Sequence, residues 1–313
     1  MKRALLALIG GRSDTPPPPA RSAGGHTCGA GALALGTMLL LATAAHADEP
    51  GPGTESAPPI ATAPASPHAV GEQLLAVAVL RTPTYPGSAN DEVKLRPAFA
   101  FRLGRWQIHS PRASDLGGLR AVREEAGAST VLREDAHWQT GLSLRLSSGR
   151  RASDDPVLAG LPDIPRSLDV RLSATRRLGA GWAASVGAQR AVGGGAPGSR
   201  LLLGVGWSGA LGEGWRARGG LAAEAGSRSF NHTYFGVEPA QALPGERPAY
   251  APGAGWIDVS FTAGVQKRLS PHWVLTATAG RGRLLGPAAD SPLTRRTAST
   301  TLLLGLAWVP GGP

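Results

Sequence analysis

The feature that most constrains this chain is an alternation of apolar residues with small or polar ones, which recurs after about residue 70. In RLLLGVGWSGAL, Leu201, Leu203, Val205 and Trp207 fall on one face of an extended strand. The segments DVSFTAGVQ and HWVLTATAG repeat the pattern. Such alternation is typical of strands with one apolar face. Beyond the N-terminal region no apolar run reaches the roughly 18 residues of a membrane-spanning helix.

Two all-β architectures produce this pattern. In a soluble sandwich the apolar face is the core, whereas in an outer-membrane barrel it meets lipid and the other face lines the lumen. The even number of expected strands, most of them long enough to cross a membrane when tilted, favours the barrel. The twelve expected strands cover 72–81, 92–103, 105–110, 117–123, 137–147, 166–178, 181–192, 199–211, 214–225, 257–269, 272–283 and 297–308.

The connections between these strands alternate between short and long. The short ones are Gly104, Gly179-Ala180, Gly212-Glu213 and Ser270-Pro271, and the long ones are 82–91, 148–165, 226–256 and 284–296. The segment 124–136, placed on the short side, breaks this rhythm. Barrels with short periplasmic turns and long extracellular loops alternate in this way. We therefore predict an antiparallel transmembrane up-and-down β-barrel of the bacterial outer-membrane type.

Tryptophan positions support the same architecture. Five tryptophans open a strand just after a connection on the short-turn side, and a sixth closes the last strand on that side. Tryptophan favours a membrane interface because its ring is apolar and its N–H needs a partner. The expected girdle consists of Trp106, Trp138, Trp182, Trp215, Trp273 and Trp308.

The N-terminus has the form of an export signal. Lys2 and Arg3 precede an apolar run that ends in the small-x-small pattern Ala45-His46-Ala47. We expect residues 1–47 to be a signal peptide, 48–70 a flexible Pro/Ala-rich periplasmic segment, and 71–313 the barrel. This organisation predicts a location in the outer membrane of a Gram-negative bacterium, in contact with its lipid.

Composition excludes several other classes. Cys28 is the single cysteine and lies in the expected signal, so the mature chain would hold no disulfide, Cys-ligated zinc or Cys nucleophile. Cleavage lowers Lys+Arg from 32 to 28 and Asp+Glu from 22 to 21, so the net charge falls from +10 to +7. These charges are scattered singly, and nucleic acid is therefore not an expected partner.

Several motifs resemble those of the MipA/OmpV family of outer-membrane proteins. LLGPAADSPL is similar to the family signature "LxGdAadSP", and FNHTYFGVEPAQA is similar to its "N-x-Y-(Y/F)-G-V" loop. TPTYPGSANDEVKLRPAFAF and GRRASDDPVLAGLPDI match two further family segments in the same order, so the resemblance covers about residues 70–308. The matching positions are Tyr85, Gly87, Arg151, Asp154, Asp155, Asn231, Tyr234, Phe235, Gly236, Tyr250, Leu285, Gly286, Asp290, Ser291 and Pro292.

The resemblance implies a non-enzymatic outer-membrane protein. The family takes its name from a scaffold that bridges a lytic transglycosylase and a bifunctional penicillin-binding protein, which implies periplasmic murein hydrolases and synthases as partners. A narrow channel for small solutes, including anions, is the alternative. The chain departs from the family in lacking the usual terminal aromatic residue and in carrying Pro287 where an acid is usual.

No catalytic constellation, metal-ligand spacing or cofactor motif is present. Ser291 follows Asp290, but the loop supplies no histidine base, so both residues are expected to be structural. Strand phase points ten charged side chains into the lumen, either as mutually paired charges or as a basic constriction. They are Lys94, Arg96, Arg102, Arg145, Asp169, Arg171, Arg216, Arg218, Glu224 and Asp258.

The loop 284–296 is longer than a turn requires. We expect it to fold inward over the mouth of the barrel with the Tyr234-Phe235 segment, as a structural gate or plug. Asp290 is expected to hold it, either through backbone N–H groups of its own loop or through an arginine.

Overall fold

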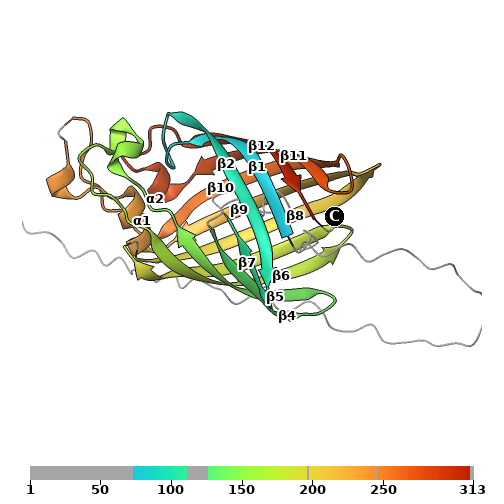
Figure 1. Cartoon of the computed structure of the whole chain (residues 1–313). Helices are drawn as coiled ribbons and strands as arrows, with labels where there is room; N and C mark the ends of the chain where they lie inside the picture. The colour runs from blue at the N-terminus through green and yellow to red at the C-terminus, as the bar shows by residue number, and fades with distance from the viewer. Residues whose placement is uncertain (1–72, 111–125, 196, 244, 311–313) are drawn as a thin grey trace, which may run out of the picture. The chain divides into compact units, whose positions relative to one another are not determined.

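A computed structural model describes residues 73–110, 126–195, 197–243 and 245–310. Their strands close into an antiparallel barrel in which each strand pairs with its neighbours in sequence and β1 pairs with β12 (Figure 1). The predicted twelve-strand barrel is confirmed. Its strands are β1 Gln73–Pro83, β2 Asp91–Leu103, β3 Trp106–His109, β4 Ala126–Glu134, β5 Trp138–Ser147, β6 Ser167–Gly179, β7 Trp182–Gly194, β8 Ser199–Gly212, β9 Trp215–Gly226, β10 Gly255–Arg268, β11 Trp273–Leu284 and β12 Ala298–Trp308.

The fourth strand differs from the sequence prediction. It occupies Ala126–Glu134, inside the segment 124–136 that was expected to be a connection, while 117–123 lies outside the described residues. Its pattern is hard to recognise because it begins with small residues. A register shift between Val131 and Arg133 also interrupts the alternation.

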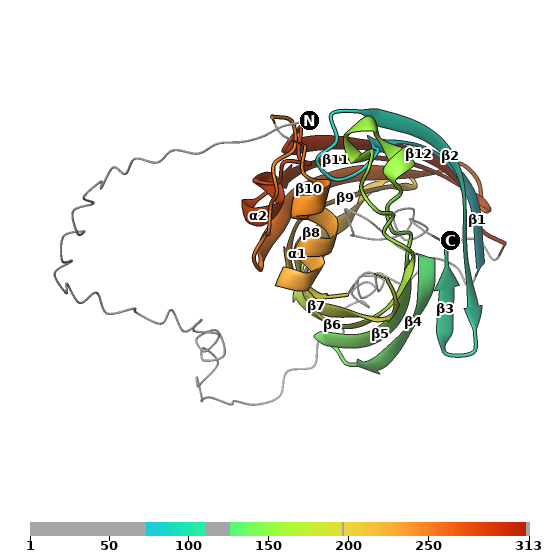
Figure 2. The ribbon, with the colours of Figure 1, turned by 90° about the vertical axis from the view of Figure 1, so that its left-hand side faces the viewer.

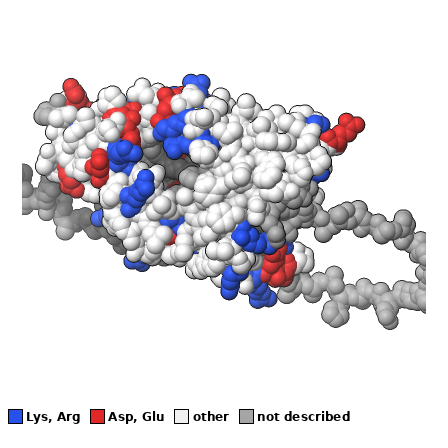
Figure 3. Space-filling view, viewed as in Figure 1, with Lys and Arg blue, Asp and Glu red and all other residues white. Residues whose placement is uncertain are grey.

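The alternation sorts the side chains to the two faces of the wall. On β1 the outward residues Leu75, Val77 and Val79 are exposed, whereas the inward Leu74 and Ala78 are buried. Other strands repeat this arrangement, so the outer wall carries an exposed apolar belt. The space-filling view shows charged groups near both ends of the barrel and uncharged atoms between them (Figure 3).

The two ends of the barrel are built differently. At the short-turn end, Ala180 and Glu213 take positive φ angles of 48° and 41°, each followed by a glycine that also has positive φ. Two such residues in succession form the tight turns that match strand twist. The expected Trp girdle lies at this end, where Trp273 pairs with Trp308 and Trp182 with Trp207.

The other end carries the long connections, which contain short helices. These are α1 Arg228–Phe235, α2 Gly286–Ala289, and the 3-10 turns η2 Ala152–Asp154, η3 Pro156–Leu158 and η4 Pro239–Gln241. None of the helices in the described residues is long and apolar enough to cross a membrane.

Candidate functional site

The long connections 84–90, 148–166, 227–254 and 285–297 contact one another at the mouth of the barrel and are called the cap here. Viewed from this end, α1 lies along the inside of the β8–β10 wall, and the connection after β5 runs across from it (Figure 2). The family motifs fall largely within the cap. Its contacts therefore show what those motifs do structurally.

Asp155 is the polar centre of the cap. Its Oδ2 accepts hydrogen bonds from Ser88 Oγ at 2.7 Å, Thr84 Oγ1 at 2.9 Å and Asn90 Nδ2 at 3.1 Å, and its Oδ1 accepts one from Val157 N at 3.0 Å. Burial alone raises the pKa of this carboxyl, but the four hydrogen bonds outweigh it and hold the pKa below its usual range. The ionised Asp155 thus ties the first hairpin to the connection after β5.

Tyr85 joins the same hairpin to the last connection. Its hydroxyl donates to the carbonyl of Leu293 at 2.7 Å, and its ring packs with Leu158, Leu161 and Val237. Burial, followed by the nearby Asp155 carboxylate, raises the pKa of Tyr85 to about 12. The phenol is therefore protonated at neutral pH and remains a hydrogen-bond donor.

Gly87 allows a second contact between these two segments. Its φ is +97°, and a Cβ at this position would lie 2.7 Å from Thr294 Oγ1. Its carbonyl accepts hydrogen bonds from the backbone N–H groups of Arg295 and Arg296. A glycine is needed here because of both the backbone conformation and the close approach.

The loop 284–296 lies against the Phe235 segment, but Asp290 does not hold it there. Ser291 Oγ donates to the carbonyl of Phe235 at 2.6 Å and accepts from Leu293 N at 3.2 Å, and Ser291 is buried. Asp290 is exposed, and among the described residues its carboxylate has no hydrogen-bond partner. The expectation for Asp290 was wrong, because the carboxylate lies toward solvent and the neighbouring hydroxyl makes the contact.

The remaining matched residues divide between packing and surface positions. Asn231 is fully buried and donates from Nδ2 to the carbonyl of Gly253 at 2.8 Å, while the carbonyl of Tyr234 accepts from Arg150 at 2.7 Å. Gly236 caps α1, and Tyr250 donates to the carbonyl of Pro287 at 3.0 Å. In the last connection, Leu285 N donates to the carbonyl of Ile257, Gly286 begins α2 and Pro292 is half-buried. Arg151 and Asp154 are exposed.

Below the cap, the interior of β6–β9 carries a buried network of charges. Arg200 donates to Glu224 Oε1 at 3.1 Å and to Asp169 Oδ2 at 3.3 Å. Gln189 connects Arg171 to these ion pairs, because Gln189 donates to Asp169 at 2.6 Å and accepts from Arg171 Nε at 2.7 Å. The sequence analysis did not name Arg200 or Gln189, although strand phase places both on the inward faces.

The ten predicted interior charges are not equally buried. Five are buried, namely Arg145, Asp169, Arg171, Glu224 and Asp258. The other five are half-buried or exposed, namely Lys94, Arg96, Arg102, Arg216 and Arg218. Inside β1 and β12 the buried residues are instead apolar, with Leu74, Ala78, Leu80 and Leu303 packed together and joined by Ala98 and Ala100 of β2. The two sides of the lumen thus differ in chemistry.

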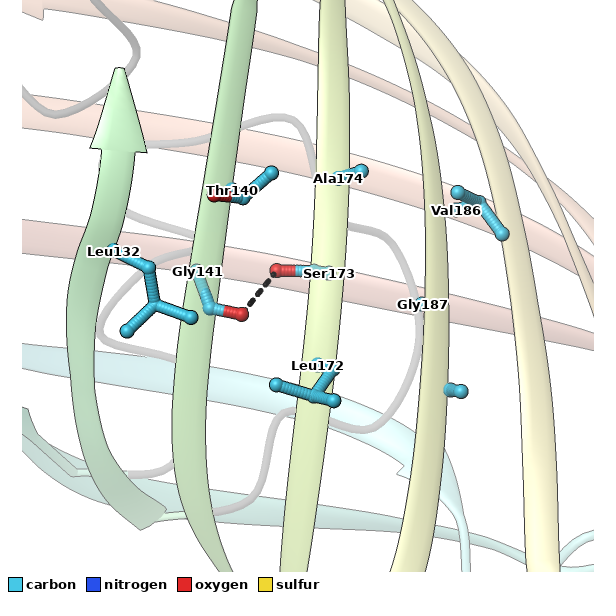
Figure 4. Close-up of a pocket in the computed structure, with 9 residues that line it drawn as sticks. Leu132, Thr140, Gly141, Leu172, Ser173, Ala174, Val186 and Gly187 are labelled. Atoms are coloured by element: carbon cyan, nitrogen blue, oxygen red, sulfur yellow. Dashed lines mark hydrogen bonds between the residues drawn. The ribbon is translucent and has the colours of Figure 1, made fainter.

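The described residues offer no candidate metal site. They contain no group of three or more His, Cys, Asp or Glu side chains that could hold a metal ion. A shallow hollow of about 320 Å³ crosses β4–β7, lined by the exposed Leu132, Leu172 and Val186 (Figure 4). Ser173 and Gly141 also line the hollow, and the Ser173 hydroxyl donates to the carbonyl of Gly141 at 3.5 Å. The hollow forms part of the apolar belt.

The comparison with protein families identifies the chain. Residues 75–310 match the model described as MltA-interacting protein MipA. The chain belongs to the MipA family. No curated protein matches it.

Some solved structures are similar to this MipA-family barrel at low identity and low TM-score. A KdgM porin is 9% identical with a TM-score of 0.39 and covers 75% of this chain and 98% of its own. A NanC porin is 9% identical with a TM-score of 0.41 and the same coverage. The COG4313 outer membrane channel from Pseudomonas putida F1 is 16% identical with a TM-score of 0.39, and covers 79% of this chain and 99% of its own.

Proposed function

We propose that this protein is a non-enzymatic barrel of the Gram-negative outer membrane that acts as a scaffold for a murein hydrolase and a murein synthase. The observation that carries the proposal is the cap. Buried bonds centred on Asp155, Tyr85 and Ser291 connect the long connections to one another across the mouth. Long connections that are bonded to one another in this way favour a structural role, and the family description names MltA as the interacting partner.

The short-turn end supplies a surface for such partners, because it faces the periplasm in a barrel of this type. Cationic groups lie over tryptophan rings there: Arg176 is 5.6 Å from the Trp138 ring centroid and Lys267 is 5.1 Å from that of Trp215. Cation–π contacts fix the positions of these charges. We call this surface the basic rim and assign it to partner proteins with acidic surfaces.

Binding to purified partners tests the scaffold. Immobilised full-length protein is exposed to a soluble lytic transglycosylase of the MltA type and to a bifunctional murein synthase. We expect the double substitution Arg176→Glu and Lys267→Glu to weaken binding about tenfold or more, since it reverses two charges at the rim. Asp155→Ala, at the opposite end, is the matched control and leaves binding unchanged. Failure of the unaltered protein to bind either enzyme better than an unrelated barrel refutes the scaffold.

A narrow channel is the second candidate, and the five less buried interior cations favour it. Arg96 and Arg216 are both exposed on inward-facing positions of β2 and β9. If the lumen conducts, planar bilayers show discrete current steps with a preference for anions, and the preference falls when both arginines become alanine. If the protein is a scaffold without a channel, the bilayers show no current steps, and that result refutes the channel.

A further inference from the structure

Arginines project from the outer wall near the loop end, where the alternation otherwise places apolar side chains. On β11, Arg281 and Arg283 occupy outward-facing positions and are exposed. On β1, Arg81 continues the outward row of Val77 and Val79, with 57% of its side chain exposed. These three arginines therefore belong to the lipid-facing surface, and we call them the outer arginine cluster.

The cluster is compact because β12 lies between its two strands. Arg81 pairs with Leu302 of β12, and Arg281 pairs with Thr300 of β12. Neighbouring strands are about 4.8 Å apart, so the two arginines flank β12 at a spacing of about 10 Å. A single ligand can contact both.

The depth of the cluster corresponds to the outer border of the apolar belt. Arg281 is eight residues beyond Trp273 of the girdle (281 − 273 = 8). At about 3.3 Å per residue and a tilt of about 40°, this places it about 20 Å above the girdle. The apolar band of such barrels is about 25 Å tall. Arg283, two residues further, reaches the level of lipid headgroups in the outer leaflet.

The contacts within the protein leave most of the cluster's donors unused. A guanidinium has five N–H donors. Arg281 uses one, from Nη1 to Thr300 Oγ1 at 3.0 Å, and Arg283 has no hydrogen-bond partner among the described residues. Arg81 contacts Asp91 at 3.0 Å, but this carboxylate is shared with Arg296. The cluster therefore keeps a net positive charge and free donors.

We propose that the outer wall of β11, β12 and β1 binds the headgroup of an outer-leaflet glycolipid that carries two phosphates. Guanidinium groups bind phosphate through two parallel hydrogen bonds, and a charge at the edge of hydrocarbon requires a counter-charge. Two arginines about 10 Å apart suit two phosphates better than one. The acyl chains would lie on the exposed Leu302 and Leu304 below. The inference rests on the outer-membrane placement proposed above.

Native mass spectrometry of the refolded full chain in detergent tests this assignment. The probes are bis-phosphorylated lipid A, the same lipid without its phosphates, and phosphatidylglycerol. We expect the unaltered protein to retain bis-phosphorylated lipid A about tenfold better than either other lipid, because only it offers two phosphates. The triple substitution Arg81→Gln, Arg281→Gln and Arg283→Gln should remove that preference. Equal retention by the triple variant, or equal retention of all three lipids by the unaltered protein, overturns the proposal.

Arg190 provides a matched control. It is exposed on the outward face of β7, eight residues beyond Trp182 (190 − 182 = 8), and is outside the cluster. Arg190→Gln should retain lipid A as well as the unaltered protein does, and an equal loss in this variant overturns the assignment to the cluster. Heat-modifiable gel migration shows whether each variant is folded. Arg281→Gln with Arg283→Gln, which keeps the Arg81–Asp91 ion pair, replaces the triple variant if that variant does not fold.

Insertion into lipid vesicles separates the two proposals. Lipid A retention in detergent, together with failure of the unaltered protein to insert into vesicles, supports the arginine cluster and refutes the outer-membrane placement. Insertion into vesicles without a preference for the phosphorylated lipid supports the outer-membrane placement and refutes the lipid site at the arginine cluster.

Discussion

Replacing Asp155 by alanine is expected to open the cap while leaving the barrel closed. The carboxylate accepts four hydrogen bonds, but without it the Thr84 and Ser88 hydroxyls, whose oxygens are 2.8 Å apart, can bond to each other, and Asn90 is exposed to water. One bond is regained between the two hydroxyls and one by Asn90 from water, so the lasting loss is close to two of the four bonds. At about 1.5 kcal/mol for each bond to a charged group, the free energy of opening the cap falls by about 3 kcal/mol.

Hydrogen exchange measures this loss directly. About 3 kcal/mol corresponds to roughly 100-fold faster exchange of protected amides in 84–90 and 150–165, with amides in β8–β11 unchanged. Asp154→Ala is the control, because Asp154 is exposed and its carboxylate accepts from the backbone N–H of Arg151 in its own turn. If the two substitutions accelerate exchange equally, Asp155 is not the centre of the cap.

The same carboxylate predicts a dependence on acid. Its pKa in the folded cap is below the ordinary 3.8, so its stabilisation is fully present above that value. The stabilisation is lost as the pH falls from there through the folded pKa, because the carboxyl becomes protonated. Protection factors in the cap, corrected for intrinsic exchange, should therefore decrease below about pH 3.8 in the unaltered protein but not in the Asp155→Ala variant.

Three further substitutions distinguish the stability of the cap from that of the barrel wall. Ser291→Ala should cost about 1–3 kcal/mol of cap stability, because it leaves the buried carbonyl of Phe235 unpaired, whereas Asp290→Ala should be nearly neutral. Protease cleavage within 284–296 measures this, and faster cleavage of the Asp290→Ala variant than of the Ser291→Ala variant would contradict it. Arg200→Ala removes the arginine that forms ion pairs with the buried carboxylates of Asp169 and Glu224, and should lower barrel stability by about 3–5 kcal/mol. Urea unfolding in detergent measures this loss, and an unchanged midpoint would contradict it.

The sequence alone determined the barrel because the features that specify it are local. Side chains of a strand alternate between faces with a period of two, so the outward rows on β1 and β11 could be assigned without knowing their neighbours. The short connections and the tryptophans beside them are equally local. Prediction failed at β4, because its alternation begins with small residues and a register shift interrupts it.

Tertiary structure alone decided which polar residues hold the cap and the interior together. Asp154, Asp155 and Asp290 belong to similar motifs, yet Asp155 is the one that is buried among donors from a hairpin 65 to 71 positions away. Arg200 likewise contacts carboxylates from β6 and β9, 31 and 24 positions distant. The physical reason is that hydrogen bonds require donors and acceptors within about 3 Å. Only the pairing of the strands into the sheet, and the packing of the long connections at its end, bring such distant residues that close.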